Sequence, residues 1–270
     1  MRGPSSPPST LTGSERKKMS ERVLLKLGGS VVTEKAKAGA IDEGRILSIA
    51  REIAKRPEKE YLLVHGAGSC GHPEAKAYGI ASGVDRRNRE GIAITHQAVL
   101  ALNREIVKGL RETGVDAVGL SPLQGCLADR GRIHSYEHRH IAAMVGLGIV
   151  PVLHGDVVMD CTRGACIISG DQLVQYLAMK MVPDRIGLAT DVPGILEGDR
   201  VIPSIVPGKF DLSSIGASGH TDVTGGMRGK VEELMELARS GRTSEIFHVS
   251  RLSDFLDGRP HGGTVVKGED

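Results

Sequence analysis

Short apolar runs alternate along this chain with longer segments of helical periodicity. Residues 23–27, 61–64, 117–120, 149–153, 186–189 and 245–249 are each an apolar run of the kind found in buried strands. Residues 43–55, 90–112, 135–147, 171–181 and 226–240 fit between them as helices. Strands that alternate with helices form a mainly parallel sheet covered on both faces. The pattern therefore predicts an α/β fold, a three-layer αβα sandwich around a mainly parallel central sheet.

The charge of the chain is concentrated at its N-terminus. Residues 1–22 carry five cationic and two acidic side chains, a surplus of three, so the formal net charge of +2 over 270 residues leaves −1 for the rest. Nucleic-acid binding needs a basic face, and base stacking needs aromatic side chains. With no Trp, three Phe and four Tyr, the body of the chain has neither feature. Binding of a nucleic acid is therefore not expected.

The ends and the cysteines indicate an ordinary cytoplasmic protein. Residues 1–20 are rich in Pro, Ser and Gly without periodicity, which predicts a disordered extension, and residues 21–270 are predicted to be a single domain. No apolar run approaches the ~20 residues of a membrane span, and the N-terminus lacks the apolar stretch of a signal peptide. The four cysteines have no metal or disulfide spacing, so we expect them to be reduced.

Glycine-rich turns follow the first two predicted strands. The first strand ends in KLGGS at residues 26–30, and the second in HGAGSCGH at residues 65–72. Ligands bind open α/β sheets at the carboxyl ends of the strands, where glycines let backbone N–H groups approach phosphate oxygens. Gly28-Gly29 alone is equally typical of a tight turn. Residues 66–71 also match the G-x-G-x-x-G dinucleotide pattern, but they follow the second strand, which makes a nicotinamide site a weak alternative.

Three later segments carry polar groups suited to anion binding. Residues 222–230, DVTGGMRGK, are one residue short of a Walker A loop and are followed by Val231, so a P-loop fold is not expected. The segment SGDQ at 169–172 opens a helix, and TDVPG at 190–194 follows a buried strand. Asp171 alone is equally well explained as an acid in the first turn of a helix.

In this order, these segments resemble the amino acid kinase superfamily from Val23 to Lys267. The Gly71-His72-Pro73 continuation is similar to the isopentenyl phosphate kinases, and fosfomycin kinases have a similar Gly-His. The chain departs from the common pattern in two places, with Gly-Ala-Gly at 66–68 where many relatives have three glycines, and TDVPG in place of TDVDG. Neither departure removes a charged group.

The resemblance implies roles for individual residues. Lys26 and Lys230 would neutralise the transferring phosphoryl group, Lys35 would hold ATP phosphates, Asp171 would orient the lysines, and His72 would donate a hydrogen bond to the acceptor phosphate. The implied ATP site comprises Lys26, Gly28, Gly29, Ser30, Thr190, Asp191, Gly194, Gly225, Gly226 and Lys230. The implied acceptor site comprises Gly66, Ala67, Gly68, Gly71, His72, Gly155 and Asp156.

The resemblance also implies the reaction, the cofactors and the assembly. ATP, with Mg²⁺ held mainly by nucleotide oxygens and water, would phosphorylate isopentenyl phosphate to isopentenyl diphosphate in an alternative mevalonate route of isoprenoid synthesis. The domain would have an N-terminal acceptor-binding lobe and a C-terminal nucleotide-binding lobe, and the family is usually homodimeric. The helix at 90–112 with Val157, Val158, Ile167 and Ile168 could enclose the apolar tail, although such residues are more often simply core.

Other interpretations remain open from the residues. A fosfomycin or phosphonate kinase would share the mechanism and differ in the acceptor pocket. A non-catalytic nucleotide-binding or anion-binding protein would not require every one of the charged residues named above. The histidines at 134, 138 and 140 have a loose metal-like spacing, but no ligand partner is evident beyond Glu137, so no protein metal ligand is assigned.

Overall fold

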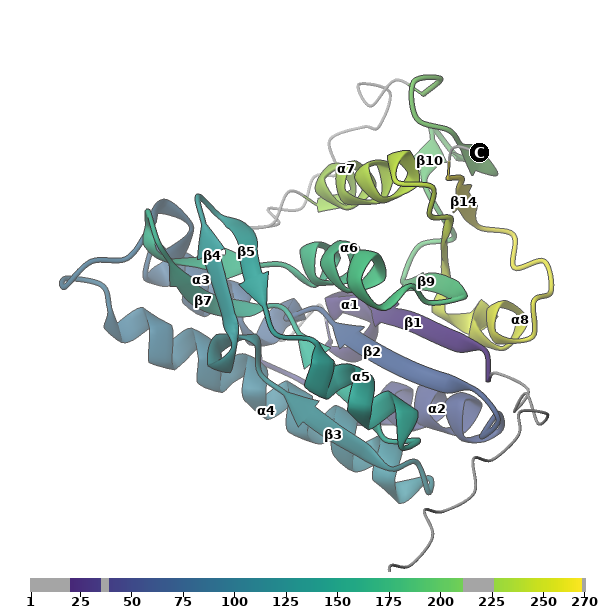
Figure 1. The fold of residues 1–270 in the computed structure, drawn as a ribbon, viewed down its shortest axis with the longest axis horizontal. Coiled ribbons are helices and arrows are strands. Elements are labelled where there is room, and N and C mark those ends of the chain that lie inside the picture. The colour runs from purple at the N-terminus through teal and green to yellow at the C-terminus, as the bar shows by residue number, and fades with distance from the viewer. Residues whose placement is uncertain (1–19, 35–38, 211–225, 269–270) are drawn as a thin grey trace, which may run out of the picture.

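The computed structural model describes residues 20–34, 39–210 and 226–268. An eight-stranded sheet in the order β12-β14-β13-β9-β1-β2-β6-β3 forms its centre (Figure 1). All neighbouring strands in it are parallel except β13 and β14. Its strands are β1 (Arg22–Leu27), β2 (Glu60–His65), β3 (Ala117–Leu120), β6 (Val150–His154), β9 (Arg185–Thr190), β12 (Ser204–Ile205), β13 (Ser244–His248) and β14 (Thr264–Val266).

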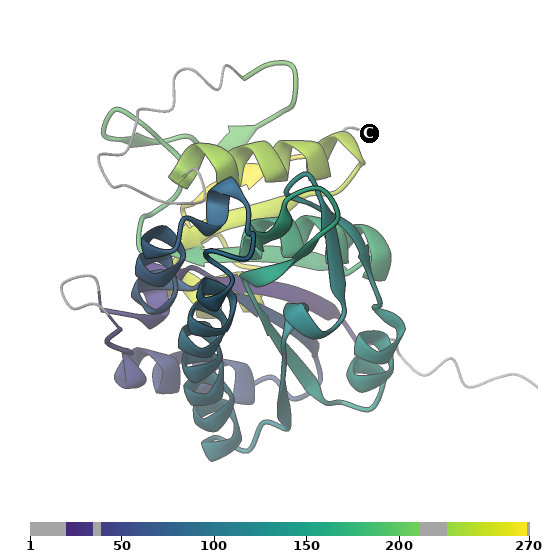
Figure 2. The ribbon, with the colours of Figure 1, turned by 90° about the vertical axis from the view of Figure 1, so that its left-hand side faces the viewer.

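Helices cover both faces of this sheet, because each strand carries apolar side chains on both sides. In β1, Leu24 joins the core beneath α5, α6 and α7, whereas Val23 and Leu25 join the core beneath α2, α4 and α8. Figures 1 and 2 show the sheet between the two helical layers. The helices are α1 (Gly29–Val32), α2 (Glu43–Ala54), α3 (His72–Ala77), α4 (Glu90–Glu112), α5 (Arg139–Gly146), α6 (Gly170–Met181), α7 (Gly226–Arg239) and α8 (Leu252–Leu256). The predicted three-layer α/β fold is therefore confirmed.

A second sheet was not predicted. It has four strands in the order β5-β4-β7-β8, with β4 (Cys126–Asp129), β5 (Arg132–Tyr136), β7 (Asp156–Asp160) and β8 (Gly164–Ile168). A small hairpin, β10 (Leu196–Glu197) with β11 (Arg200–Val201), lies apart from it. Single 3₁₀ turns are η1 (Gly68–Cys70), η2 (Ile80–Ser82), η3 (Pro122–Gln124) and η5 (Val249–Arg251).

The predicted helix at 135–147 was wrong at its start. Its first residues belong to strand β5, and the helix begins only at Arg139. The hydroxyl group of Tyr176 on α6 accepts a hydrogen bond from the Tyr136 N–H (3.1 Å) and donates one to the Tyr136 carbonyl (3.0 Å), which holds this segment extended. His134 consequently lies in a strand while His140 lies in a helix, and the described residues contain no group of three metal-ligating side chains.

The predictions for residues 1–20 fall almost wholly outside the described residues, as do Lys35 and Gly225. Within the described ranges, no helix combines the length and the apolar character that crossing a membrane requires. All four cysteines are free thiols.

Candidate active site

The two glycine turns touch each other through their backbones. Strands β1 and β2 are parallel neighbours, with Leu27 in register with His65, so both turns leave the sheet at the same edge. A Cβ atom on Gly29 would lie 2.3 Å from the Gly68 nitrogen, and one on Gly66 would lie 2.8 Å from the Gly29 nitrogen. Gly68 also has a φ of 55°, in the left-handed region. Glycine is therefore required here by close approach and by conformation.

A buried cluster of charges lies beside these turns. Lys26, near the end of β1, places its Nζ 2.8 Å from Oδ1 of Asp171. Lys230, on α7, donates to both oxygens of the same carboxylate at 3.1 and 3.2 Å. Asp171 is in the first turn of α6, whose N-cap Ser169 accepts a hydrogen bond from the Gln172 N–H at 3.1 Å. We call Lys26, Asp171 and Lys230 the lysine–aspartate cluster.

Burial and mutual attraction shift the pKa values within the lysine–aspartate cluster. Desolvation lowers the pKa of Lys26 to about 8, an effect that Asp171 opposes and Lys230 reinforces. Desolvation alone would raise the pKa of Asp171, but Lys230 and Lys26 outweigh it and bring this pKa down to about 2. At neutral pH the cluster therefore holds two ammonium groups and one carboxylate, an excess of one positive charge beside the glycine turns.

The cluster and both turns line one cavity of about 520 Å³. Gly155 and Asp156 line the same cavity, as do Gly71 and His72 at the end of the second turn. The predicted residues found on its wall are Lys26, Gly28, Gly29, Ser30, Gly66, Ala67, Gly68, Gly71, His72, Gly155, Asp156, Asp171, Thr190, Asp191 and Lys230. The structure thus brings together most of a set that spans more than 200 positions of the chain.

Four predicted residues are not among the described residues of the cavity wall. Gly194 packs against strand β14, where an added Cβ would lie 2.8 Å from the Thr264 Oγ1, and it is absent from the cavity wall. Lys35 and Gly225 lie outside the described residues, and Gly226 is the first residue of α7.

The wall near His72 is largely apolar. His72 begins α3, and the preceding Gly71 packs so closely against α4 that an added Cβ would lie 2.4 Å from the Val99 Cγ2. Ala75, Val99, Ile167 and Ile168 line the cavity. Ile167 and Ile168 are two of the residues named from the sequence as able to enclose an apolar tail. Val157 and Val158 are instead fully buried in two separate cores. Those two residues are structural.

Sequence reasoning missed several polar residues of the wall. Thr33, Ser69, Thr95 and Ser169 line the cavity but were not among the predicted site residues. Ser69 and Ser169 lie within the HGAGSCGH and SGDQ segments, whereas Thr33 and Thr95 belong to no recognisable motif. Thr95 lies within the regular pattern of α4, so only the packing of that helix against the turn could reveal it. The Oγ atoms of Ser69 and Thr95 are buried and have no hydrogen-bond partner among the described residues.

Asp156 is held by its neighbours at the edge of the cavity. It is 1% exposed, and its Oδ2 lies 2.9 Å from the His96 Nδ1 and 3.1 Å from the Ser121 Oγ. Its Oδ1 accepts a hydrogen bond from the Val157 N–H at 2.8 Å. The hydrogen bond to Asp156 raises the pKa of His96. The carboxylate is therefore satisfied within the fold.

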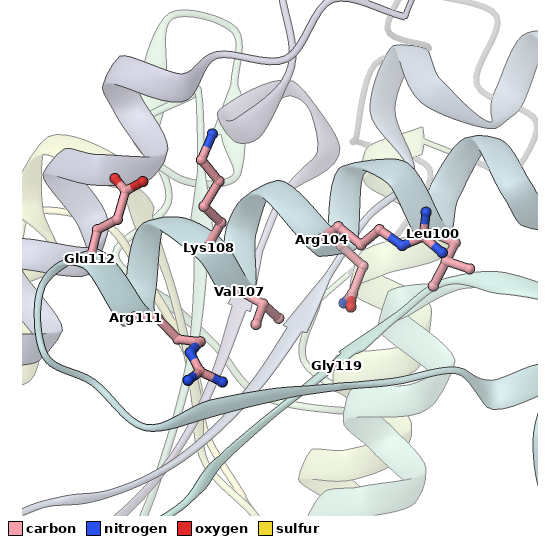
Figure 3. Close-up of a pocket in the computed structure, with 8 residues that line it drawn as sticks. Leu100, Arg104, Val107, Lys108, Arg111, Glu112 and Gly119 are labelled. Atoms are coloured by element: carbon pink, nitrogen blue, oxygen red, sulfur yellow. The ribbon is translucent and has the colours of Figure 1, made fainter.

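A second depression, of about 690 Å³, lies between α4 and the edge strand β3 (Figure 3). Arg104, Lys108 and Arg111 line it from the helix, and Gly119 from the strand. None of the predicted site residues borders it. The smaller cavity, with its glycine turns and lysine–aspartate cluster, is the candidate active site.

Comparisons with known proteins agree with this assignment. Residues 21–248 match the model of the amino acid kinase family. The chain is 37% identical over 264 residues to the isopentenyl phosphate kinase of Methanothermobacter thermautotrophicus, covering 92% of this chain and 99% of that protein. It is 39% identical over 249 residues to the isopentenyl phosphate kinase of Haloferax volcanii, with the same coverage. A solved structure described as isopentenyl phosphate kinase matches with a TM-score of 0.82 and 34% identity, covering 91% of this chain and 100% of that one.

These matches confirm the prediction of a kinase, and the family match extends from β1 to β13. The matched region includes both glycine turns, Asp171 and Lys230. The chain belongs to the amino acid kinase family.

Proposed function

We propose that the protein transfers the γ-phosphoryl group of ATP to the phosphate of isopentenyl phosphate, giving isopentenyl diphosphate and ADP. One observation carries the proposal: a single cavity joins the glycine turns and lysine–aspartate cluster to an apolar wall of Ala75, Val99 and Ile167, with His72 beside it. A phosphate monoester with a short hydrocarbon tail has this distribution of polar and apolar groups. The curated relatives described above carry this activity in their names.

The reaction needs charge neutralisation more than it needs a base. A phosphate monoester has a second pKa near 6, so at neutral pH its oxygen is already nucleophilic. That oxygen attacks the γ-phosphorus, a new P–O bond forms, and the bond to the β,γ-bridging oxygen breaks with departure of ADP. Repulsion between two unit charges ~4 Å apart costs roughly 4 kcal/mol at an effective dielectric near 20. Lys26 and Lys230, held in place by Asp171, would offset this repulsion.

The two substrates would occupy opposite sides of the lysine–aspartate cluster. The acceptor would lie against Gly66–Gly68, Gly71 and His72, which come from the N-terminal part of the chain. The nucleotide would lie against Thr190, Asp191 and Lys230, which come from the C-terminal part. This arrangement corresponds to an N-terminal acceptor-binding lobe and a C-terminal nucleotide-binding lobe around one cavity.

Mg²⁺ would enter as a complex with ATP. The described residues offer no cage of three or more ligating side chains, and the carboxylate of Asp171 already binds two ammonium groups. Phosphate oxygens and water are the ligands that Mg²⁺ retains in such sites. The metal would neutralise charge on the nucleotide, and the protein would hold the metal through the nucleotide.

A coupled assay of ADP release with Mg-ATP tests the proposal against six acceptors: isopentenyl phosphate, dimethylallyl phosphate, fosfomycin, acetylglutamate, carbamate and UMP. We expect the highest kcat/KM with isopentenyl phosphate. A preference for fosfomycin would transfer the same mechanism to a phosphonate acceptor. Silence with all six would favour a non-catalytic nucleotide-binding protein.

His72→Ala tests the acceptor side separately. The imidazole lines the cavity from the start of α3, and its removal should abolish turnover of the phosphate acceptor while ATP binding stays nearly intact. Calorimetric titration with a non-hydrolysable ATP analogue supplies the control. Unchanged turnover by this variant would refute the assigned role.

We further propose a cytoplasmic homodimer. ATP is abundant in the cytoplasm, and free thiols persist in a reducing compartment. Strand β3 is an edge of the central sheet, and its Val118 is 38% exposed. The next residue, Gly119, borders the depression between β3 and α4 (Figure 3). A second copy that paired along this edge would cover both features. Light scattering after size-exclusion chromatography should give twice the mass of one chain. In Val118→Lys the measured mass should fall to that of a single chain.

A further inference from the structure

Two buried histidines lie directly behind the glycine residues of the cavity. His65 ends β2 and His154 ends the neighbouring strand β6, where the two are partners in register. Both are 0% exposed, and their ring centroids are 5.4 Å apart. Neither lines the cavity, but the glycine that follows each of them does. The histidines are therefore in a position to act on the turns from within the protein.

The hydrogen bonds around His65 determine which ring nitrogen carries the proton. The amide nitrogen of Asn103 lies 3.0 Å from the Val152 carbonyl oxygen, which can only accept, so this nitrogen must be the donor there. The same amide nitrogen lies 3.1 Å from the His65 Nε2, which must then accept its second hydrogen. The neutral ring consequently carries its proton on Nδ1, which lies 3.0 Å from the Gly66 carbonyl oxygen. Burial, with His154 nearby, lowers the pKa of His65 to about 3 and keeps the ring neutral.

A hydrogen bond to the Gly66 carbonyl orients the whole peptide group that follows. In a planar trans peptide the N–H points away from the C=O, so a carbonyl held towards His65 directs the Ala67 N–H to the opposite side. Ala67 lines the cavity, and none of its described neighbours accepts a hydrogen bond from this N–H. Glycine at 66 would otherwise leave the peptide free to rotate.

We propose that His65 is a positioning residue, which holds the Gly66–Ala67 peptide through its Nδ1–H so that the Ala67 N–H faces the phosphate of the acceptor. Asn103 in turn holds the ring in the required tautomer. The inference rests on the proposed function for the identity of the acceptor. The part that concerns the ring stands on the hydrogen bonds alone.

Two amide substitutions separate positioning from mere packing. In His65→Asn the amide nitrogen replaces Nδ1 and keeps the donor to Gly66, but the partner of Asn103 is lost. In His65→Gln the amide oxygen replaces Nε2 and keeps the bond from Asn103, but the donor to Gly66 is lost. Gln fills more of the space left by the imidazole and should give the more stable variant, whereas Asn keeps the donor to Gly66 and should give the more active one. A residue that served only packing would give the same order for stability and activity.

The experiment measures kcat, both KM values and thermal unfolding for the two variants and the wild-type protein. We expect His65→Gln to raise the KM for isopentenyl phosphate about tenfold to a hundredfold, the loss of one hydrogen bond to a charged group, with the KM for ATP unchanged. His65→Asn should stay within about threefold of the wild type, because a neutral donor remains. Equal activity of the two variants, or greater activity of the Gln variant, would overturn the inference.

Nitrogen-15 spectra of the histidine rings of the wild-type protein decide the tautomer without any substrate. Between pH 6 and 8, His65 should show a protonated Nδ1 and an unprotonated Nε2. A proton on Nε2 would overturn the inference even in an active enzyme. If the wild-type protein did not phosphorylate isopentenyl phosphate, the proposed function would fail, and the ring spectrum would still decide the assignment of His65.

Discussion

The carboxyl ends of β1 and β2 carry two buried polar clusters that differ in charge. Lys26, near the end of β1, is paired on the cavity wall with Asp171, which also pairs with Lys230. His65, at the end of β2, is neutral and bonds to Asn103 behind the wall. Burial disfavours the charged form of both side chains. Only the lysine has an opposite charge within hydrogen-bond reach, so only the lysine keeps a charge for phosphate.

His96, on α4, follows the same rule. Its Nδ1 contacts the Asp156 carboxylate at 2.9 Å, and its pKa is raised. Desolvation dominates at His154, which also faces Asp156 but at 3.7 Å, and its pKa is lowered. A close hydrogen bond to a carboxylate thus decides in which direction the pKa of a base in this region shifts.

Removing the shared carboxylate should break the charged cluster most severely. Asp171→Asn leaves two ammonium groups facing each other, and we expect kcat to fall by about a thousandfold as the lysines lose their positions. The free energy of unfolding should fall by about 3 kcal/mol because a buried pair loses one partner. Steady-state kinetics and urea unfolding measure the two effects.

The double variant Lys26→Met/Asp171→Asn is the matched control. It removes one of the two opposed ammonium groups, so stability should recover in part while activity stays low. If the double variant lost as much stability as the two single variants together, the cluster would not act as an electrostatic unit.

Alkaline pH should discharge Lys26 without any substitution. The pKa of Lys26 is lowered to about 8 in the free protein, so kcat/KM should fall about tenfold per pH unit above this value. The effect on stability has the opposite sign. Between about pH 8 and the ordinary lysine pKa, the unfolded chain binds more protons than the folded one, so the contribution of Lys26 to the unfolding free energy rises with pH.

A pH profile of kcat/KM for the wild type and for Lys26→Arg checks this assignment. Arginine stays charged throughout the range, so the alkaline decline should disappear in the variant, whatever its activity at neutral pH. A wild-type profile that is flat to about pH 9.5 would rule out Lys26 as the titrating group.

Acid pH should act on the neutral cluster, with a smaller effect. The folded pKa of His65 is lowered to about 3, so between the unfolded pKa and this value only the unfolded chain takes up the proton. From pH 7 to pH 5, the free energy of unfolding should fall by about 2 kcal/mol from His65 alone. His154 should add to this loss, whereas His96, with its raised pKa, should oppose it.

Urea unfolding of the wild type and of His65→Gln at both pH values isolates the contribution of His65. The free energy of unfolding should change less between pH 7 and pH 5 in the variant than in the wild type, by about the same 2 kcal/mol. If the free energy of unfolding changed equally in the two proteins, His65 would take up a proton in the folded state as readily as in the unfolded chain.

The central fold and the polar residues of the site followed from local patterns. The predicted strand at 23–27 lies within β1, and the predicted helix at 90–112 coincides with α4, because both have an unbroken pattern of burial. The second sheet was missed because strands such as β5, with mostly exposed residues before Tyr136, lack a period that sequence can reveal. Gly194 matched a motif, yet packing against Thr264 removes it from the cavity.

By itself the sequence determined the order in which the main strands and helices follow one another along the chain. It also determined the glycines at two strand ends and the presence of Lys26, Asp171 and Lys230. These are local properties, since periodicity and backbone freedom depend on near neighbours. Only the tertiary structure decided that Asp171 lies between two lysines and that Asn103 meets His65 across 38 positions of chain. Charge and tautomer depend on burial and on partners distant in sequence, and those exist only once the sheet and its helices have packed.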